Sequence, residues 1–150
     1  MTIRAMTIED YDAVYALWGS LPGIGLHPRD DSRERIVYYL RRNPDTCFVA
    51  EEDGALLGAV LCGNDGRRGY INHLAVTADR QGQGVGRALV NACLAAMSRE
   101  GIGKCSLMVF RGNDAGNAFW DAVGSVRREE ILYRNLNTNY EKMEGDGHAC

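Results

Sequence analysis

The sequence lacks a long apolar run, and its net charge is only −3. No run approaches the roughly 20 residues that span a bilayer, and residues 1–6 do not resemble the start of a signal peptide. We therefore expect no membrane partner and a cytoplasmic location. With 17 basic and 20 acidic residues, the chain also lacks the basic excess of a nucleic-acid-binding protein, so no such partner is expected.

The spacing of cysteine and histidine gives no support to a metal centre or a disulfide framework. The cysteines form no Cys-x-x-Cys pair and the three histidines are scattered, so no metal site is expected. Four cysteines lie inside apolar runs, where the usual role is that of a small core residue, and we expect free thiols in a reducing compartment. The five are Cys47, Cys62, Cys93, Cys105 and Cys150.

The length of 150 residues suits one domain with a sizeable core. We predict a single domain over residues 1–136. Residues 137–150 are polar, contain glycine and have few apolar side chains, which predicts a mobile tail.

Apolar periodicity and turn residues predict both helices and strands. Helices are predicted from Thr7 to Gly19, from about Ser32 to Asn43, from the segment after residue 84 to Gly101, and over residues 113–124. Strands are predicted over residues 2–6, 46–51, 56–62, 70–76, 104–110 and 130–136. Short turns join the strands between residues 46 and 76 into an antiparallel meander. The helix that follows makes strand 104–110 parallel to strand 70–76.

Residues 21–28 contain two prolines and two glycines and are predicted to form a loop. Its apolar side chains fit two roles, the entrance to a substrate site or a packed connector, and the sequence does not separate them.

A glycine-rich segment follows strand 70–76 and precedes a helix. Its three glycines leave the backbone accessible, and the helix that begins there offers free N–H groups and the positive end of its dipole. Such a segment binds a phosphate or pyrophosphate, and Arg80 and Arg87 flank it. The predicted binding residues are Gln81, Gly82, Gln83, Gly84, Val85, Gly86 and Arg87.

Three phosphate-binding patterns compete for this segment, beside a glycine turn without a ligand. A P-loop requires Lys after its last glycine, which is absent, and Ala88 stands where a hydroxyl would be expected. The dinucleotide pattern Gly-x-Gly-x-x-Gly fails because Arg87 takes the place of its third glycine. The pattern Gln/Arg-x-x-Gly-x-Gly/Ala fits residues 81–86 at every position. That pattern resembles the pyrophosphate loop of the GNAT superfamily of acyl-CoA-dependent N-acyltransferases.

The order of elements from residue 2 to 136 also resembles the GNAT fold. The resemblance implies an α/β (α+β) fold, a mixed sheet of six to seven strands with about four helices, and strands four and five splayed around acyl-CoA. Leu74, Ala75 and Val76 resemble the end of the family's fourth strand, whose edge pairs with the pantetheine arm. Residues 113–124 resemble its second motif, which implies cofactor contacts from Asn113, Asn117 and Trp120.

The resemblance implies an N-acetyltransferase that moves an acetyl group from acetyl-CoA to a primary amine by direct attack. Such a reaction needs a donor for the carbonyl oxygen, for which a backbone N–H near residues 74–76 is expected, and a base for the amine proton. The family often has a carboxylate on the fourth strand, but this chain has Tyr70, Asn72 and His73. We predict His73 as the base, directly or through a water that Tyr70 and Asn72 orient. Strand alternation puts His73 on the opposite face unless a bulge intervenes, so a core histidine is the alternative.

Two positions depart from the family pattern. Trp120 stands where the family usually has the tyrosine that protonates the leaving thiolate, and an indole is not an acid near neutral pH. The thiolate then leaves with hydrogen-bond help alone, or Tyr133 or water protonates it. Ser125 replaces the usual apolar residue after Gly124.

Two other functions stay open at this point. One is a non-catalytic acyl-CoA-binding or sensor protein with the same fold, and the other is a nucleotide-binding domain for ATP or NAD. The acceptor, a small-molecule or protein amine, is not specified by any motif, and homodimer formation is common in the family.

Overall fold

The structure is a computed structural model that describes residues 1–138. Over this range the chain forms one five-stranded sheet in the order β1-β2-β3-β4-β5. The strands are β1 (Thr2–Ala5), β2 (Phe48–Glu52), β3 (Ala55–Asn64), β4 (Gly69–Val76) and β5 (Cys105–Leu107). The helices are α1 (Tyr11–Ser20), α2 (Arg33–Arg42), α3 (Val85–Arg99) and α4 (Asp114–Ala122), with short 3₁₀ helices η1 (Ile8–Asp10) and η2 (Ala78–Arg80).

The pairing of the strands confirms the predicted mixed α/β fold. Neighbouring strands from β1 to β4 are antiparallel, and β5 is parallel to β4. The turn between β2 and β3 uses Asp53 and Gly54, both with positive φ. The described residues form five strands rather than six to seven.

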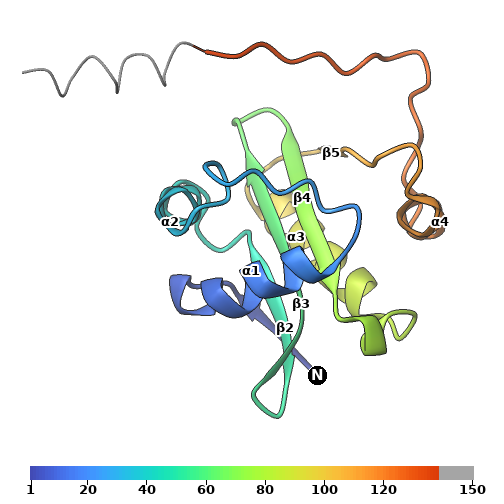
Figure 1. The fold of residues 1–150 in the computed structure, drawn as a ribbon. Coiled ribbons are helices and arrows are strands. Elements are labelled where there is room, and N and C mark those ends of the chain that lie inside the picture. The colour runs from blue at the N-terminus through green and yellow to red at the C-terminus, as the bar shows by residue number, and fades with distance from the viewer. Residues whose placement is uncertain (139–150) are drawn as a thin grey trace, which may run out of the picture.

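The sheet separates two apolar cores, as the nearly continuous apolar sequence of β3 predicts. Helices α1 and α2 cover one face, where Trp18 and Ile36 pack against Ala59 and Leu61. Helix α3 covers the other face, where Leu89 packs with Val60. Figure 1 shows α1 and α2 in front of the sheet and α3 behind it.

The predicted strand at residues 130–136 is wrong. This segment follows α4 as extended chain without a strand partner, and its apolar side chains are exposed, namely Ile131, Leu132, Tyr133 and Leu136. A strand needs an adjacent edge with which to pair, and β5 ends at Leu107, well before the predicted residue 110. Arg127 forms an ion pair with Asp121 of α4, which holds the start of the segment beside the helix instead. The mobile tail predicted for residues 137–150 lies, from residue 139 on, outside the described part of the chain.

The described cysteines are free thiols, as the sequence predicted. Cys47, Cys62 and Cys93 are buried and Cys105 is half-buried. Burial raises the pKa of Cys47 to about 12 and that of Cys105 to about 11. Gly69 gives Cys105 its space, because a Cβ atom at Gly69 would lie 2.6 Å from the Cys105 sulfur.

Two properties of the described residues bear on the requirements of a membrane span and of a metal site. None of their helices combines the length and apolar character that crossing a bilayer requires. No group of three or more of their His, Cys, Asp or Glu side chains is arranged to hold a metal ion.

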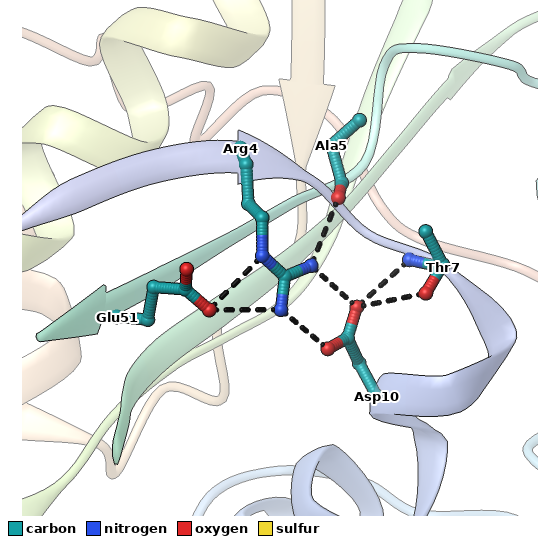
Figure 2. Close-up of polar contacts among 5 residues, drawn as sticks. All are labelled: Arg4, Ala5, Thr7, Asp10 and Glu51. Carbon is teal, nitrogen blue, oxygen red and sulfur yellow. Dashed lines mark hydrogen bonds and ion pairs between the residues drawn. The ribbon is translucent and has the colours of Figure 1, made fainter. Parts of the chain in front are cut away.

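Arg4 joins β1 to β2 and to the first turn that follows β1 (Figure 2). Its guanidinium donates two hydrogen bonds to Asp10, of 2.7 and 2.8 Å, and one of 3.0 Å to Glu51. Asp10 also accepts a 2.8 Å hydrogen bond from the Thr7 N–H, a contact typical of a helix start. The hydrogen bonds from Arg4 lower the pKa of the Asp10 carboxyl, although burial opposes them.

Replacing Asp10 with Asn should make this contribution to stability visible. Because the Asp10 pKa is lowered in the folded state, its contribution is present above the unfolded pKa of about 3.9 and is lost as the pH falls through the folded value. We expect Asp10→Asn to reduce the free energy of unfolding by about 1 kcal/mol at neutral pH, and the difference from wild type to be smaller at about pH 3. Urea unfolding at both pH values measures it. If the difference in unfolding free energy between Asp10→Asn and wild type were equal at both pH values, the loss of stability would come from packing.

Candidate active site

β4 has an open edge over its second half. Gly69, Tyr70 and Ile71 pair with β5, but no described strand lies beside residues 72–76 on that side. Their other edge pairs with β3. Every second residue of such a strand directs its N–H and C=O groups to the open edge. Leu74, Ala75 and Val76 therefore border a gap between diverging strands, as the sequence predicted for this segment.

A β-bulge interrupts β4 at His73. Leu61 of β3 faces Asn72, and Ala59 faces Ala75, so His73 and Leu74 together oppose a single residue of β3. His73 has a φ of 49°, in the left-handed region that non-glycine residues rarely adopt. Because of the extra residue, two consecutive side chains of β4 point to the same face of the sheet instead of to opposite faces.

The bulge brings Asn72 and His73 to the same face of the sheet. The Asn72 side chain lines one cavity with Tyr39 of α2, and the His73 ring packs edge-on against Trp18 of α1, with 5.0 Å between ring centroids. Leu74 packs on the opposite, α3 face. The sequence had left open whether a bulge would allow this arrangement.

Asp31, in the loop between α1 and α2, holds the His73 ring. Its Oδ1 lies 2.8 Å from His73 Nε2, and its Oδ2 accepts a 2.7 Å hydrogen bond from the His27 N–H. Burial alone would raise the pKa of Asp31, but these hydrogen bonds outweigh it and the pKa is lowered. The ionised carboxylate favours the tautomer with the proton on Nε2, which leaves Nδ1 as the acceptor nitrogen.

The backbone around this pair is also fixed. The Trp18 indole N–H donates to the His73 carbonyl at 3.1 Å, and the Tyr11 hydroxyl donates to the Asp31 carbonyl at 2.9 Å. Sequence reasoning did not select Asp31 for the site. Its one signal was its position near the start of α2, which does not indicate a partner 42 residues away.

A cavity of about 390 Å³ lies beside Asn72, between α2 and the β3–β4 hairpin. Two of the predicted residues, Tyr70 and Asn72, line it, whereas His73, which follows Asn72 in β4, does not. Tyr133 does not line it. Tyr133 is 69% exposed, in the extended segment beyond α4 that Figure 1 shows passing above the sheet, apart from it. The full lining is Tyr38, Tyr39, Arg42, Asn43, Gly63, Asn64, Asp65, Tyr70 and Asn72.

The glycine-rich segment forms the turn between η2 and α3. Gly82 and Gly84 have φ values of 73° and 87°, which favour glycine. A Cβ atom at either position would meet nothing within 4 Å, so the loop backbone faces open space. The Ala88 N–H donates to the Gly84 carbonyl at 3.0 Å as the first helical bond. The N–H groups of Val85, Gly86 and Arg87 precede it and lie outside the helical ladder, as an anion site requires.

The polar side chains of this loop have partners within the protein. Gln81 donates to the Val76 carbonyl at 3.1 Å, and Gln83 donates to the Asp79 carbonyl at 2.7 Å. Arg87 donates to the carbonyl of Ala122 at the end of α4, at 2.8 Å. These contacts fix the loop and leave its backbone as the exposed surface.

Helix α4 borders the other side of the loop. A Cβ atom at Gly86 would lie 3.0 Å from the Phe119 ring, and Phe119 packs edge-on against Trp120 with 5.1 Å between ring centroids. Asn113 caps the helix by accepting from the Gly116 N–H at 2.9 Å. Asn117 donates to the Asn113 carbonyl at 2.8 Å. The two predicted asparagines thus shape the turn into α4.

The loop between α1 and α2 packs against the β5–α4 connection. A Cβ atom at Gly23 would lie 2.7 Å from the Asn113 amide nitrogen, and one at Gly25 would lie 3.3 Å from the Phe110 ring. Through Asp31 the same loop contacts His73 of β4. It therefore connects the two sides of the gap between β4 and β5.

Comparison with known proteins is consistent with this geometry. The sequence profile of the acetyltransferase (GNAT) family matches residues 11–124. An acetyltransferase of Pectobacterium atrosepticum is 36% identical over 115 residues, which are 77% of this chain and 80% of that protein. An acetyltransferase of Yersinia enterocolitica is 34% identical over 132 residues, which are 88% of this chain and 92% of that protein.

Solved structures share the fold. Ard1 of Thermoplasma volcanium superposes with a TM-score of 0.73 at 24% identity, covering 83% of this chain and 82% of that one. The PaiA N-acetyltransferase of Thermoplasma acidophilum, solved in complex with coenzyme A, superposes with a TM-score of 0.72 at 20% identity, covering 82% of this chain and 87% of that one.

Replacing Trp18 with Phe should weaken the bulge. The ring packing is largely kept, but the His73 carbonyl loses its indole donor, which we expect to cost about 1–2 kcal/mol of unfolding free energy. Amide hydrogen exchange of β4 should also become faster. Urea unfolding and exchange mass spectrometry measure the two effects.

Trp120→Phe is the matched control. It removes an indole N–H for which the described residues show no partner. Equal losses in the two variants would mean that the hydrogen bond to His73 does not support the bulge.

Proposed function

The chain belongs to the GNAT family of acetyltransferases, and from this premise we propose that it transfers the acetyl group of acetyl-CoA to a primary amine by direct attack of the amine. One observation carries the proposal. The open edge of β4 begins beyond the last pair with β5, at the bulge where Asp31 holds His73, and it leads into the loop whose backbone faces open space.

The residues around the gap fit a coenzyme A molecule. The N–H groups of Val85, Gly86 and Arg87 bind its diphosphate at the start of α3. The open edge formed by Leu74, Ala75 and Val76 pairs with its pantetheine amides, as the family resemblance implies. Gly82 and Gly84 support the fit, because no side chain fills the space over them. When bound, acetyl-CoA supplies an activated acetyl thioester.

His73 accepts the proton of the attacking amine in this proposal. An alkylammonium has a pKa of about 10.4 and must lose its proton before it attacks. Asp31 holds the imidazole through Nε2, so Nδ1 is the nitrogen that accepts. Tyr70 and Asn72, on the same side of β4, orient the amine or an intervening water. An N–H of the open edge donates to the carbonyl oxygen as negative charge develops there.

Solvent protonates the leaving thiolate in this proposal. The Trp120 indole can donate a hydrogen bond but does not act as an acid. Tyr133 is exposed and lies outside the residues around the cavity, so its role as the donor remains a prediction from the sequence. A thiol has an ordinary pKa of about 8.5, so the thiolate is an acceptable leaving group near neutral pH.

The second candidate is an acyl-CoA-binding protein without transferase activity. Trp120 in place of the usual tyrosine, and the lack of a carboxylate on β4, favour it. Release of free thiol from acetyl-CoA in the presence of a panel of amines separates the two, because only a transferase releases thiol in proportion to the amine.

Gly84→Val should abolish coenzyme A binding and leave the protein folded. A β-branched residue at a φ of 87° costs about 1–2 kcal/mol and displaces the loop backbone. We expect the Kd for coenzyme A, measured by calorimetry, to rise at least about tenfold. Gly66→Val is the matched control, because Gly66 has a φ of 86°, also faces open space and lies in the β3–β4 turn. Unchanged affinity in Gly84→Val would contradict the loop assignment.

Ligand protection tests the nucleotide-binding alternative with the wild-type protein. Acetyl-CoA should raise the melting temperature, and ATP and NAD should not. Equal protection by ATP or NAD would favour a nucleotide-binding domain over the acetyltransferase.

His73→Gln should lower kcat/KM at neutral pH by about 10²–10⁴-fold without changing coenzyme A affinity. Asp31→Asn should also lower kcat/KM, because it removes the carboxylate that holds the imidazole in place. Thiol-release kinetics measure both. Normal turnover in His73→Gln would remove it from the mechanism. Normal turnover in Asp31→Asn would mean that this carboxylate does not position the ring.

A further inference from the structure

The cavity beside Asn72 has a built floor. A Cβ atom at Gly63 would lie 2.6 Å from the Asn43 amide oxygen and 2.8 Å from the Tyr39 hydroxyl, so only glycine allows these groups to pack there. Asn43 also accepts a 3.2 Å hydrogen bond from the Asn64 N–H. At about 390 Å³, the cavity falls in the range of roughly 300–1,000 Å³ of small-molecule sites.

Tyrosine rings form the walls of the cavity. Tyr38 of α2 and Tyr70 of β4 are 57% and 44% exposed, and both line it. Exposed aromatic rings of this kind bury the aliphatic part of a ligand. Tyr70 and Asn72 lie two residues apart on one face of β4, which corresponds to about 7 Å. The walls therefore suit an aliphatic chain that runs along β4 toward His73.

Two opposite charges also line the cavity. Arg42, in the last turn of α2, forms no ion pair with the described residues. Asp65 lies in the β3–β4 turn, where its Oδ1 accepts 2.8 Å hydrogen bonds from the N–H groups of Arg67 and Arg68. These bonds lower the pKa of Asp65 and keep it ionised. Its Oδ2 has one long contact, 3.5 Å from the Tyr70 hydroxyl, and is available to a ligand.

A guanidinium and a carboxylate in the lining of one cavity match a zwitterionic head group. Arg42 binds an α-carboxylate, and Asp65 binds the α-ammonium beside it. A polyamine would leave Arg42 facing a cation, and a dicarboxylate would leave Asp65 facing an anion. A four-carbon side chain spans roughly 5–6 Å, from bonds of about 1.5 Å, which is comparable to the separation of about 7 Å between Tyr70 and Asn72 along β4.

We propose that the acceptor is a diamino carboxylic acid of the lysine or ornithine type, acetylated on its distal amine. The inference rests on the proposed acetyltransferase function. The transfer forms an N–C bond at the distal nitrogen and breaks the thioester C–S bond. The proton of that nitrogen passes to His73, and the sulfur leaves as a thiolate that solvent protonates.

Four acceptors test the head group with the full chain and acetyl-CoA. L-lysine and L-ornithine carry both charges, cadaverine lacks the carboxylate and 6-aminohexanoate lacks the α-ammonium. We expect kcat/KM for one of the two diamino acids to exceed that for each truncated amine by at least about tenfold. Mass spectrometry of the product should locate the acetyl group on the distal nitrogen.

Two variants assign the charges. Arg42→Ala should raise KM for lysine about tenfold or more and leave cadaverine unaffected. Asp65→Asn should raise KM for lysine and leave 6-aminohexanoate unaffected. Arg41→Ala is the matched control, because Arg41 is the adjacent exposed arginine of α2 and does not line the cavity.

The outcomes separate this inference from the proposed function. Three results would overturn the head-group assignment and leave acetyl transfer intact. They are equal kcat/KM for lysine and cadaverine, acetylation of the α-nitrogen, and an Arg42→Ala loss of kcat/KM that both amines share. Turnover of other amines but of none of these four would also overturn it. Thiol release that is the same whether or not an amine is present, in a protein that binds coenzyme A, would contradict the proposed function. It would contradict this inference as well.

Discussion

The backbone of His73 takes a left-handed conformation in the middle of β4, at a φ of 49°. Such a conformation costs a residue with a side chain about 1–2 kcal/mol, and contacts from Trp18 and Asp31 offset it. The inserted residue turns Asn72 and His73 to one face and returns Leu74 to the other. It also lies just beyond the last pair with β5, at the point where the strands diverge. The imidazole and the open strand edge are therefore neighbours because of one bulge.

Local signals were sufficient for most of the fold. The antiparallel meander, the crossover helix and the glycine-rich turn follow from turn residues and periodicity within short stretches of sequence, and the structure has each of them. The bulge could not be predicted in this way, because its supports are Trp18 and Asp31, which lie 55 and 42 residues from His73. The expected strand at residues 130–136 failed for a related reason. Its apolar pattern is local, but pairing depends on the length of β5.

The motif residues have two different roles. Some have side chains that hold the loop in shape, and others have backbone groups that are exposed to a ligand. Gln81, Gln83 and Arg87 lie within or beside the phosphate-binding pattern, yet their side chains bond to carbonyl groups of the protein. Asn113 and Asn117 likewise fold the turn before α4. The surface left for a ligand consists of backbone groups. The sequence indicates such a surface only by its glycines, which have no side chain to cover it. A motif match alone does not distinguish these two roles.

The described cysteines differ in burial, so their labelling rates can distinguish local opening of the structure from global unfolding. Cys47, Cys62 and Cys93 are inaccessible, so a maleimide reaches them only after the sheet and its helices separate. Cys105 is half-buried on β5, beside the junction from which the two strands diverge. Labelling of Cys105 thus follows local fraying of that junction, and labelling of the other three follows global unfolding. The ratio of the two rates compares opening at the β4–β5 junction with global unfolding.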